Sequence, residues 1–149
     1  MKPFSVLAAA ALALSLGAAI PASAQQPPAP PASSSIATMS APQAITANPR
    51  LAARIEPFLP GKADVTKAAT GFHDVATFLA TVHLAHNQQL SFQALKSQVM
   101  NGGPATLVKA VQAVAPKLPP SLAQEAVQMA QHQAELDLGA AEEAHAFGR

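Results

Sequence analysis

The sequence contains no cysteine, no tryptophan and no tyrosine. The absence of cysteine excludes disulfide bonds, and it also excludes an anchor built on a lipid-modified N-terminal cysteine. The folded state must therefore be stabilised by side-chain packing alone.

Strand signals are missing as well. No window alternates apolar and polar residues for more than a few positions, as a half-buried strand requires. Helical spacing and helix caps recur along the chain instead. We therefore predict an all-α fold, a small irregular helical bundle with a long C-terminal amphipathic helix.

The first 24 residues read as a secretory signal peptide. Lys2 supplies the positive end, an uncharged apolar run extends from Phe4 to Ile20, and Ala22–Ala24 has the small-x-small pattern that signal peptidase cuts. The run is short for a transmembrane helix, which needs about 20 apolar residues. We expect cleavage after Ala24 and a periplasmic or secreted mature protein, with an uncleaved membrane anchor as the alternative.

The remainder divides into three segments by composition. Residues 25–47 are rich in proline, alanine and serine, so we predict a disordered linker there. Residues 48–120 are expected to form a compact helical domain, and residues 121–149 a long acidic amphipathic helix. Asn48 and Ser91 are expected N-caps, and Ser121 with Gln124 forms a capping-box pattern.

Apolar residues at helical spacing predict which faces are buried. In the helix expected over residues 74–87, Val75, Phe78, Leu79 and Val82 share one face. In the next helix the residues expected to face inward are Phe92, Leu95 and Val99. In the helix after that they are Leu107, Val108, Val111 and Val114. In the long helix the expected apolar half is Leu122, Ala126, Met129, Ala130, Ala134, Leu136, Ala140, Ala141, Ala144 and Phe147, with Gln133 and Asp137 intruding on it.

Charge is balanced overall but unevenly distributed. Removal of the leader takes away Lys2 and leaves eight basic and eight acidic side chains, so no global field favours nucleic acid or anionic lipid. Seven bases lie between Arg50 and Lys117, whereas five of the six charged residues after Leu118 are acids. We expect the basic body and the acidic tail to touch, within one molecule or between two.

Three short patterns follow one another in the middle of the chain: Gly71-Phe72, Val82-His83 near the end of a helix, and the Phe-x-x-Leu-Lys stretch at residues 92–96. In these patterns the chain resembles a family of small exported bacterial proteins of unknown function. His73-Asp74 stands where the family pattern has Lys-Asn. The resemblance covers residues 48–115, and it implies an envelope location and a compact helical module without a known activity.

Five histidines suggest a metal site, because His83 and His86 lie one helical turn apart. A zinc ion would need further ligands, for which His73, Asp74 and His132 are the candidates. The alternative is that a histidine on an apolar face is neutral and bonded to a backbone carbonyl. No other cofactor is expected.

Enzymatic motifs are absent from the sequence. There is no cysteine nucleophile, no Gly-x-Ser-x-Gly elbow, and the Gly102-Gly103 pair lacks the Gly-Lys-Ser/Thr ending of a phosphate loop. We expect a non-enzymatic helical module that binds a protein or an envelope component, and a histidine-based metal-binding or pH-responsive protein is the alternative.

The expected partner is an envelope or secreted protein, with no nucleic acid and no membrane once the signal is cleaved. The expected contact elements are the helix after Ser121 and a basic patch at Arg50, Arg54, Lys62 and Lys67. Self-association through the C-terminal helix is a further hypothesis.

Overall fold

A computed structural model describes residues 36–102 and 107–147. The described residues all belong to one compact unit. The predicted signal peptide, its cleavage site and linker residues 25–35 lie outside the described residues.

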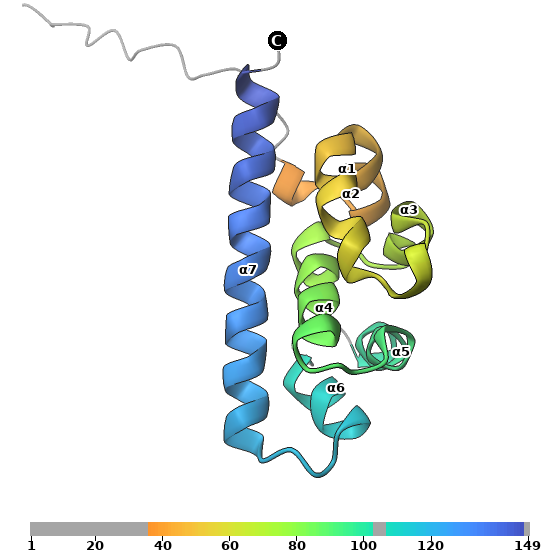
Figure 1. The fold of residues 1–149 in the computed structure, drawn as a ribbon, viewed down its shortest axis with the longest axis vertical. Coiled ribbons are helices and arrows are strands. Elements are labelled where there is room, and N and C mark those ends of the chain that lie inside the picture. Colours follow the sequence, from red (N-terminus) through yellow and green to blue (C-terminus); the bar gives the residue numbers. More distant parts are fainter. Residues whose placement is uncertain (1–35, 103–106, 148–149) are drawn as a thin grey trace, which may run out of the picture. The chain divides into compact units, whose positions relative to one another are not determined.

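Every regular element of the described residues is helical, which confirms the predicted all-α bundle with a long C-terminal helix (Figure 1). None of these helices is long and apolar enough to span a membrane. The elements follow in the order η1 (Ile36–Thr38), α1 (Ala41–Ala47), α2 (Pro49–Ile55), η2 (Glu56–Phe58), η3 (Pro60–Lys62), α3 (Val65–Ala69), α4 (Val75–Asn87), α5 (Phe92–Gly102), α6 (Leu107–Val114) and α7 (Pro120–Phe147).

Helix α4 forms the centre of the fold, because nine of its 13 residues are buried. Its Phe78 ring lies 5.4 Å from the ring of Phe72 and 6.4 Å from that of Phe92, measured between centroids. Aromatic rings at such distances pack edge to face and bury a large apolar area. The predicted inner face of this helix, including Val75 and Leu79, is fully buried and thus confirmed.

Two predicted helix caps are also confirmed. The Asn48 side chain accepts a hydrogen bond from the Leu51 backbone N–H at 3.0 Å, and α2 begins at the next residue. The Ser91 hydroxyl accepts from the Ala94 N–H at 3.3 Å at the start of α5. Each cap satisfies a backbone donor that has no partner within its helix.

The prediction of a disordered linker as far as residue 47 is wrong for its last part. Residues 36–38 and 41–47 are helical, and Ile36 and Ile45 are almost completely buried. Pro42 lies in the first turn of α1, where proline costs no hydrogen bond. This proline-containing segment therefore packs on the core through Ile36 and Ile45, together with the buried Ala41 and Ala44.

Helix α7 runs along α4 (Figure 1), but part of its predicted inner face is wrong. Leu122, Met129 and Leu136 are 49%, 53% and 57% exposed. The buried residues are instead mostly small, since short side chains let two helices approach closely. They are Ala123, Ala126, Val127, Ala130, Ala134, Asp137, Leu138 and Ala141, of which four alanines were correctly predicted.

Candidate functional site

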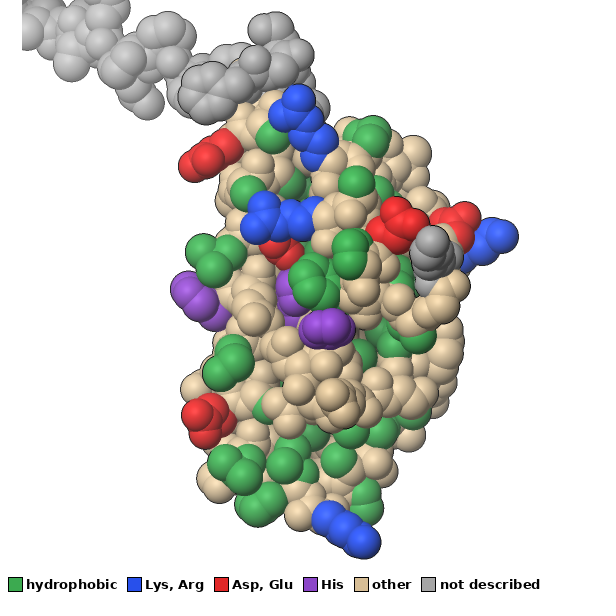
Figure 2. Space-filling model, in the orientation of Figure 1, with side chains coloured by type: hydrophobic (Ala, Val, Ile, Leu, Met, Phe, Trp, Pro, Cys, Tyr) green, Lys and Arg blue, Asp and Glu red, His purple; other side chains and the backbone are tan. Residues whose placement is uncertain are grey.

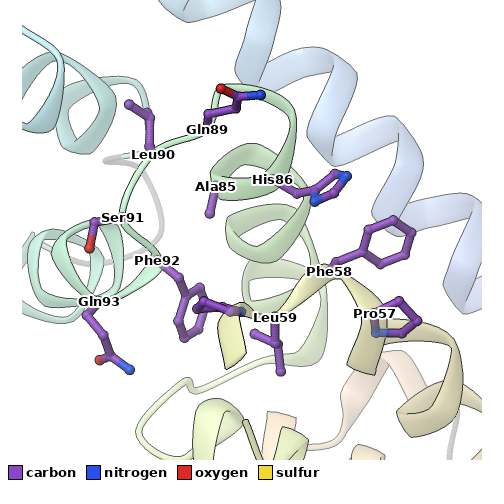
Figure 3. Close-up of a pocket in the computed structure, with 11 residues that line it drawn as sticks. Pro57, Phe58, Leu59, Ala85, His86, Gln89, Leu90, Ser91, Phe92 and Gln93 are labelled. Atoms are coloured by element: carbon purple, nitrogen blue, oxygen red, sulfur yellow. The ribbon is translucent and has the colours of Figure 1, made fainter. Parts of the chain in front are cut away.

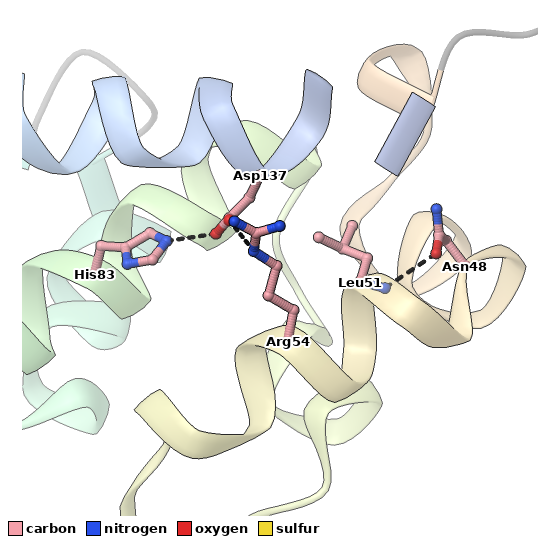
Figure 4. A network of polar contacts seen from close by, with 5 residues as sticks. All are labelled: Asn48, Leu51, Arg54, His83 and Asp137. Carbon is pink, nitrogen blue, oxygen red and sulfur yellow. Dashed lines mark hydrogen bonds and ion pairs between the residues drawn. The ribbon is translucent and has the colours of Figure 1, made fainter. Parts of the chain in front are cut away.

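A buried group of charged and polar side chains joins three helices (Figure 4). The carboxylate of Asp137 on α7 accepts from Nε of Arg54 on α2 at 2.6 Å through Oδ1. Its Oδ2 lies 2.7 Å from Nε2 of His83 on α4. The side chains of Asp137 and His83 are 6% and 7% exposed, whereas that of Arg54 is 55% exposed. The carboxylate is therefore held on both oxygens, and Arg54 is the more exposed of its two partners.

A second polar contact holds α2 against α7. The amide of Asn48 donates to the carbonyl oxygen of Ala141 at 3.2 Å, while its own oxygen caps α2. Asn48 and Arg54 thus attach both ends of this short helix to the long one.

The site explains why an aspartate intrudes on the inner face of α7. An ionised carboxylate in a protein interior is tolerated when each oxygen is paired and hydrogen-bonded. Asp137 meets that condition, and its contact with Arg54 confirms that the basic body and the acidic helix touch within one molecule. His83 is hydrogen-bonded to a side-chain carboxylate rather than to the expected backbone carbonyl.

The ring of Phe58 connects this charged group to the molecular surface. Its centroid lies 5.1 Å from the ring of His83 and 5.0 Å from the ring of His86. His83 is buried on one side of this contact, and His86 is exposed on the other. Phe58 therefore packs against both of the histidines that the sequence pairs.

A surface groove of about 510 Å³ begins at Phe58 and His86 (Figure 3). Its volume falls within the range of small-ligand sites, roughly 300–1,000 Å³. One wall is the segment 57–60 after α2, and the other is formed by the end of α4 and the beginning of α5. Figure 3 shows Phe92 pointing from α5 toward Leu59 on the opposite wall.

The lining of the groove carries hydrogen-bonding groups but no formal charge. No aspartate, glutamate, lysine or arginine is among the residues that line it. Gln89, Ser91 and Gln93 supply amide and hydroxyl groups, and His86 adds an imidazole. The groove can thus accommodate a neutral group that has both apolar and hydrogen-bonding parts.

The backbone of Gln89 is in the left-handed region, with φ of 51°. The Leu90 N–H bonds the carbonyl of Ala85 at 2.9 Å, and the Gln89 N–H bonds that of His86 at 3.2 Å. This is the ending that usually places glycine at the left-handed position. A glutamine there retains a polar side chain on the groove at the cost of backbone strain.

Helix α5 is fixed beside the groove by Lys96. Its ammonium group donates to the carbonyl of Ala68 on α3 at 2.9 Å and lies 5.6 Å from the ring centre of Phe72. Burial lowers the pKa of Lys96 from its usual value, because desolvation penalises the charged form.

The structure does not bring the candidate metal ligands together. Asp74 lies at the opposite end of α4 from His86 and accepts from the Thr77 N–H at 2.7 Å. His132 is exposed on α7, with its Nδ1 3.8 Å from a carboxylate oxygen of Glu135. Within residues 36–102 and 107–147, no three His, Cys, Asp or Glu side chains are grouped to hold a metal. Metal binding by His83 and His86 stays a prediction that calorimetric titration would test.

The residues of the expected basic patch have different surroundings. Arg54 is paired with Asp137, and Arg50 lines a hollow of about 150 Å³ beside that pair. Lys67 is exposed on α3, and the side chain of Lys62 is not described. Figure 2 shows basic side chains lying singly among acidic ones on the face in view.

Sequence reasoning missed the groove, because its walls come from segments that only the tertiary fold brings together. Phe58, Gln89 and Gln93 belong to no sequence motif that indicates a groove. Comparison of the chain with protein-family models, with curated proteins and with solved structures gives no match.

Proposed function

We propose that the chain is an exported, non-enzymatic binding module that holds an uncharged, partly apolar segment of a partner protein in the groove between residues 57–60 and the α4–α5 turn. The observation that carries this proposal is the lining of the groove. Apolar walls and neutral hydrogen-bonding side chains surround a space of about 510 Å³.

The absence of charge in the lining sets the chemistry of the ligand. A charged group buried there would lose its hydration without gaining a partner, and such desolvation costs several kcal/mol. Neutral peptide groups suit the glutamine amides, because both the amides and the peptide bonds offer donors and acceptors. Phe58, Leu59 and Leu90 provide contacts for an apolar side chain.

The polar groups around the groove support binding rather than catalysis. The Ser91 hydroxyl caps α5 by accepting from the Ala94 N–H, and among the described residues it makes no hydrogen bond to a base that would activate it as a nucleophile. His83 is buried, its Nε2 is paired with Asp137, and the ring of Phe58 packs against it. The pair therefore holds α4 and α7 together and supports the ring that forms the groove wall.

The proposal is tested with an array of short peptides that have blocked ends and no charged residue. Peptides that bind the chain from Gln25 onward are titrated by fluorescence anisotropy. Substitution Gln93→Arg places a charge in the lining, and it is expected to weaken binding about tenfold or more. The matched control is Gln98→Arg, an exposed position on the same helix that does not line the groove.

Three results would contradict the proposal. They are an array on which no neutral peptide binds, equal weakening by the two arginine variants, and binding of neutral oligosaccharides in place of peptides. Circular dichroism of each variant verifies that the helical content is unchanged.

A further inference from the structure

The outer side of α7 carries a stripe of large apolar side chains that the fold does not use. Leu122, Met129 and Leu136 are each about half exposed. Figure 2 shows apolar side chains alternating with acidic and histidine side chains along the α7 edge of the molecule.

The three residues recur at intervals of seven. A seven-residue repeat keeps side chains on one side of a helix, and two helices pair along such a stripe. Glu125 and His132 lie between the apolar positions on the same exposed side. We define Leu122, Glu125, Met129, His132 and Leu136 as the outer stripe.

We propose that the outer stripe binds a second copy of this chain, with the two α7 helices antiparallel and Met129 at the two-fold axis. Leu122 and Leu136 lie seven residues before and after Met129. In an antiparallel pair, Leu122 of each copy therefore lies beside Leu136 of the other. A symmetric dimer requires such self-complementarity of one surface.

Charge favours the antiparallel arrangement over the parallel one. Exposed Lys117 precedes α7, whereas exposed Glu143 lies near its other end. Antiparallel pairing brings Lys117 of one copy near Glu143 of the second, and His132 near Glu125 of the second. Parallel pairing instead places each glutamate beside its own equivalent, and like charges repel.

The contact is short, so the dimer is expected to be weak. From Leu122 to Leu136 the helix rises about 21 Å, and stable complexes usually bury more than about 1,000 Å² in total. We therefore expect a dissociation constant in the micromolar range and a monomer–dimer equilibrium that depends on concentration.

The proposal assigns the expected self-association through the C-terminal helix to one side of that helix. The alanine-rich face is not available for a second copy, because Ala126, Ala130 and Ala134 are buried within the domain. This inference is independent of the groove, which lies between other elements.

Sedimentation velocity across a range of micromolar concentrations tests the dimer on the chain from Gln25 onward. Met129→Glu places two like charges at the axis and is expected to raise the dissociation constant about tenfold or more. Gln131→Glu adds the same charge at an exposed position off the stripe and is expected to leave the equilibrium unchanged.

The absence of cysteine makes orientation directly measurable by disulfide trapping. Met129→Cys is expected to form a disulfide-linked dimer, and Leu122→Cys alone is not. A mixture of Leu122→Cys and Leu136→Cys is expected to cross-link. A parallel pair would cross-link each single variant with itself, and this pattern would overturn the proposed orientation.

The proposal fails if the chain is monomeric throughout the concentration range. It also fails if Gln131→Glu weakens the dimer as much as Met129→Glu. Association that appears only after addition of a foreign helical protein would assign the outer stripe to a different partner and likewise overturn it.

Discussion

Helices α4 and α7 lie side by side, yet they use apolar residues in opposite ways. In α4 the large side chains Phe78, Leu79 and Leu84 are fully buried. In α7 the buried positions are mostly alanine, and three large apolar residues, Leu122, Met129 and Leu136, are about half exposed. The central helix thus stabilises the fold by the area it buries, and the long helix does so by close approach and by the polar contacts of Asp137.

The clearest test of this difference begins with a leucine of α4. Leu84→Ala removes a side chain with no solvent exposure, so it loses transfer free energy and leaves a cavity. We expect the free energy of unfolding to fall by about 3 kcal/mol. Urea denaturation followed by circular dichroism measures it, and a loss below about 1 kcal/mol would contradict the central role of α4.

The contribution of α7 to the stability of the fold is expected to depend on its one buried carboxylate, that of Asp137. Asp137→Ala removes the partner of Arg54 and His83, and we expect the free energy of unfolding to fall by about 2 kcal/mol. The effect is below that of a fully buried ion pair, because the Arg54 side chain is 55% exposed and regains water.

Asp137→Asn separates charge from hydrogen bonding at the same position. An asparagine oxygen can still accept from His83 but no longer attracts Arg54 as an ion. We expect this variant to lose less stability than Asp137→Ala. Equal losses in both variants would show that the negative charge, rather than the hydrogen bond, is what stabilises α7.

Close approach of α7 to α4 predicts that larger side chains are not tolerated on its inner face. Ala130 is 1% exposed, so Ala130→Leu inserts a branched side chain where no space exists. Overpacking of this kind should lower the free energy of unfolding by about 1.5 kcal/mol. The control Gln131→Leu is exposed and should change stability little, which thermal unfolding of both variants would verify.

The end of α4 offers a change that should increase stability. Gln89 has φ of 51°, a conformation that costs an L-residue roughly 1 kcal/mol more than glycine. We expect Gln89→Gly to stabilise the domain by about 0.5 kcal/mol, after allowance for the greater flexibility of glycine when unfolded.

Gln88→Gly is the matched control, because Gln88 has φ of −96° and gains nothing from glycine. That variant should be neutral or destabilising in chemical denaturation. If both substitutions stabilise equally, strain at Gln89 is not the cause.

Local features of the fold were predictable from the sequence, and tertiary contacts were not. The cap of α2 by Asn48 and the inner face of α4 follow from spacing and from residue type within one helix. The helical segment at 36–47 was missed, because its proline and alanine content outweighed two isoleucines whose burial depends on distant elements.

The candidate site was predicted only in its parts. Asp137 was identified as an intruder on an apolar face, and His83 as a candidate metal ligand, but nothing in the sequence indicates that they meet. Residues 54 apart are paired only by the packing of α7 on α4. The groove was unpredictable for the same reason, because its two walls belong to different segments.

Leu136 of α7 allows the leucine-to-alanine substitution proposed for buried Leu84 of α4 to be made at an exposed site. Leu136 on α7 is 57% exposed, so Leu136→Ala creates no internal cavity. The substitution also introduces alanine, the residue of highest helix propensity. At a concentration where the chain is monomeric, we expect the free energy of unfolding to change by less than about 0.5 kcal/mol. At high concentration the same variant should lose the additional stability that a wild-type dimer gains by mass action.

Two measurements of Leu136→Ala therefore distinguish the possible roles of this leucine. A loss at low concentration comparable to that of Leu84→Ala would mean that Leu136 packs within its own domain. A loss confined to high concentration would mean that the leucine is retained for contact between copies. No loss at either concentration would mean that Leu136 and the outer stripe do not contribute to stability. Of the two leucines compared, only Leu84 of α4 would then be shown to stabilise the protein.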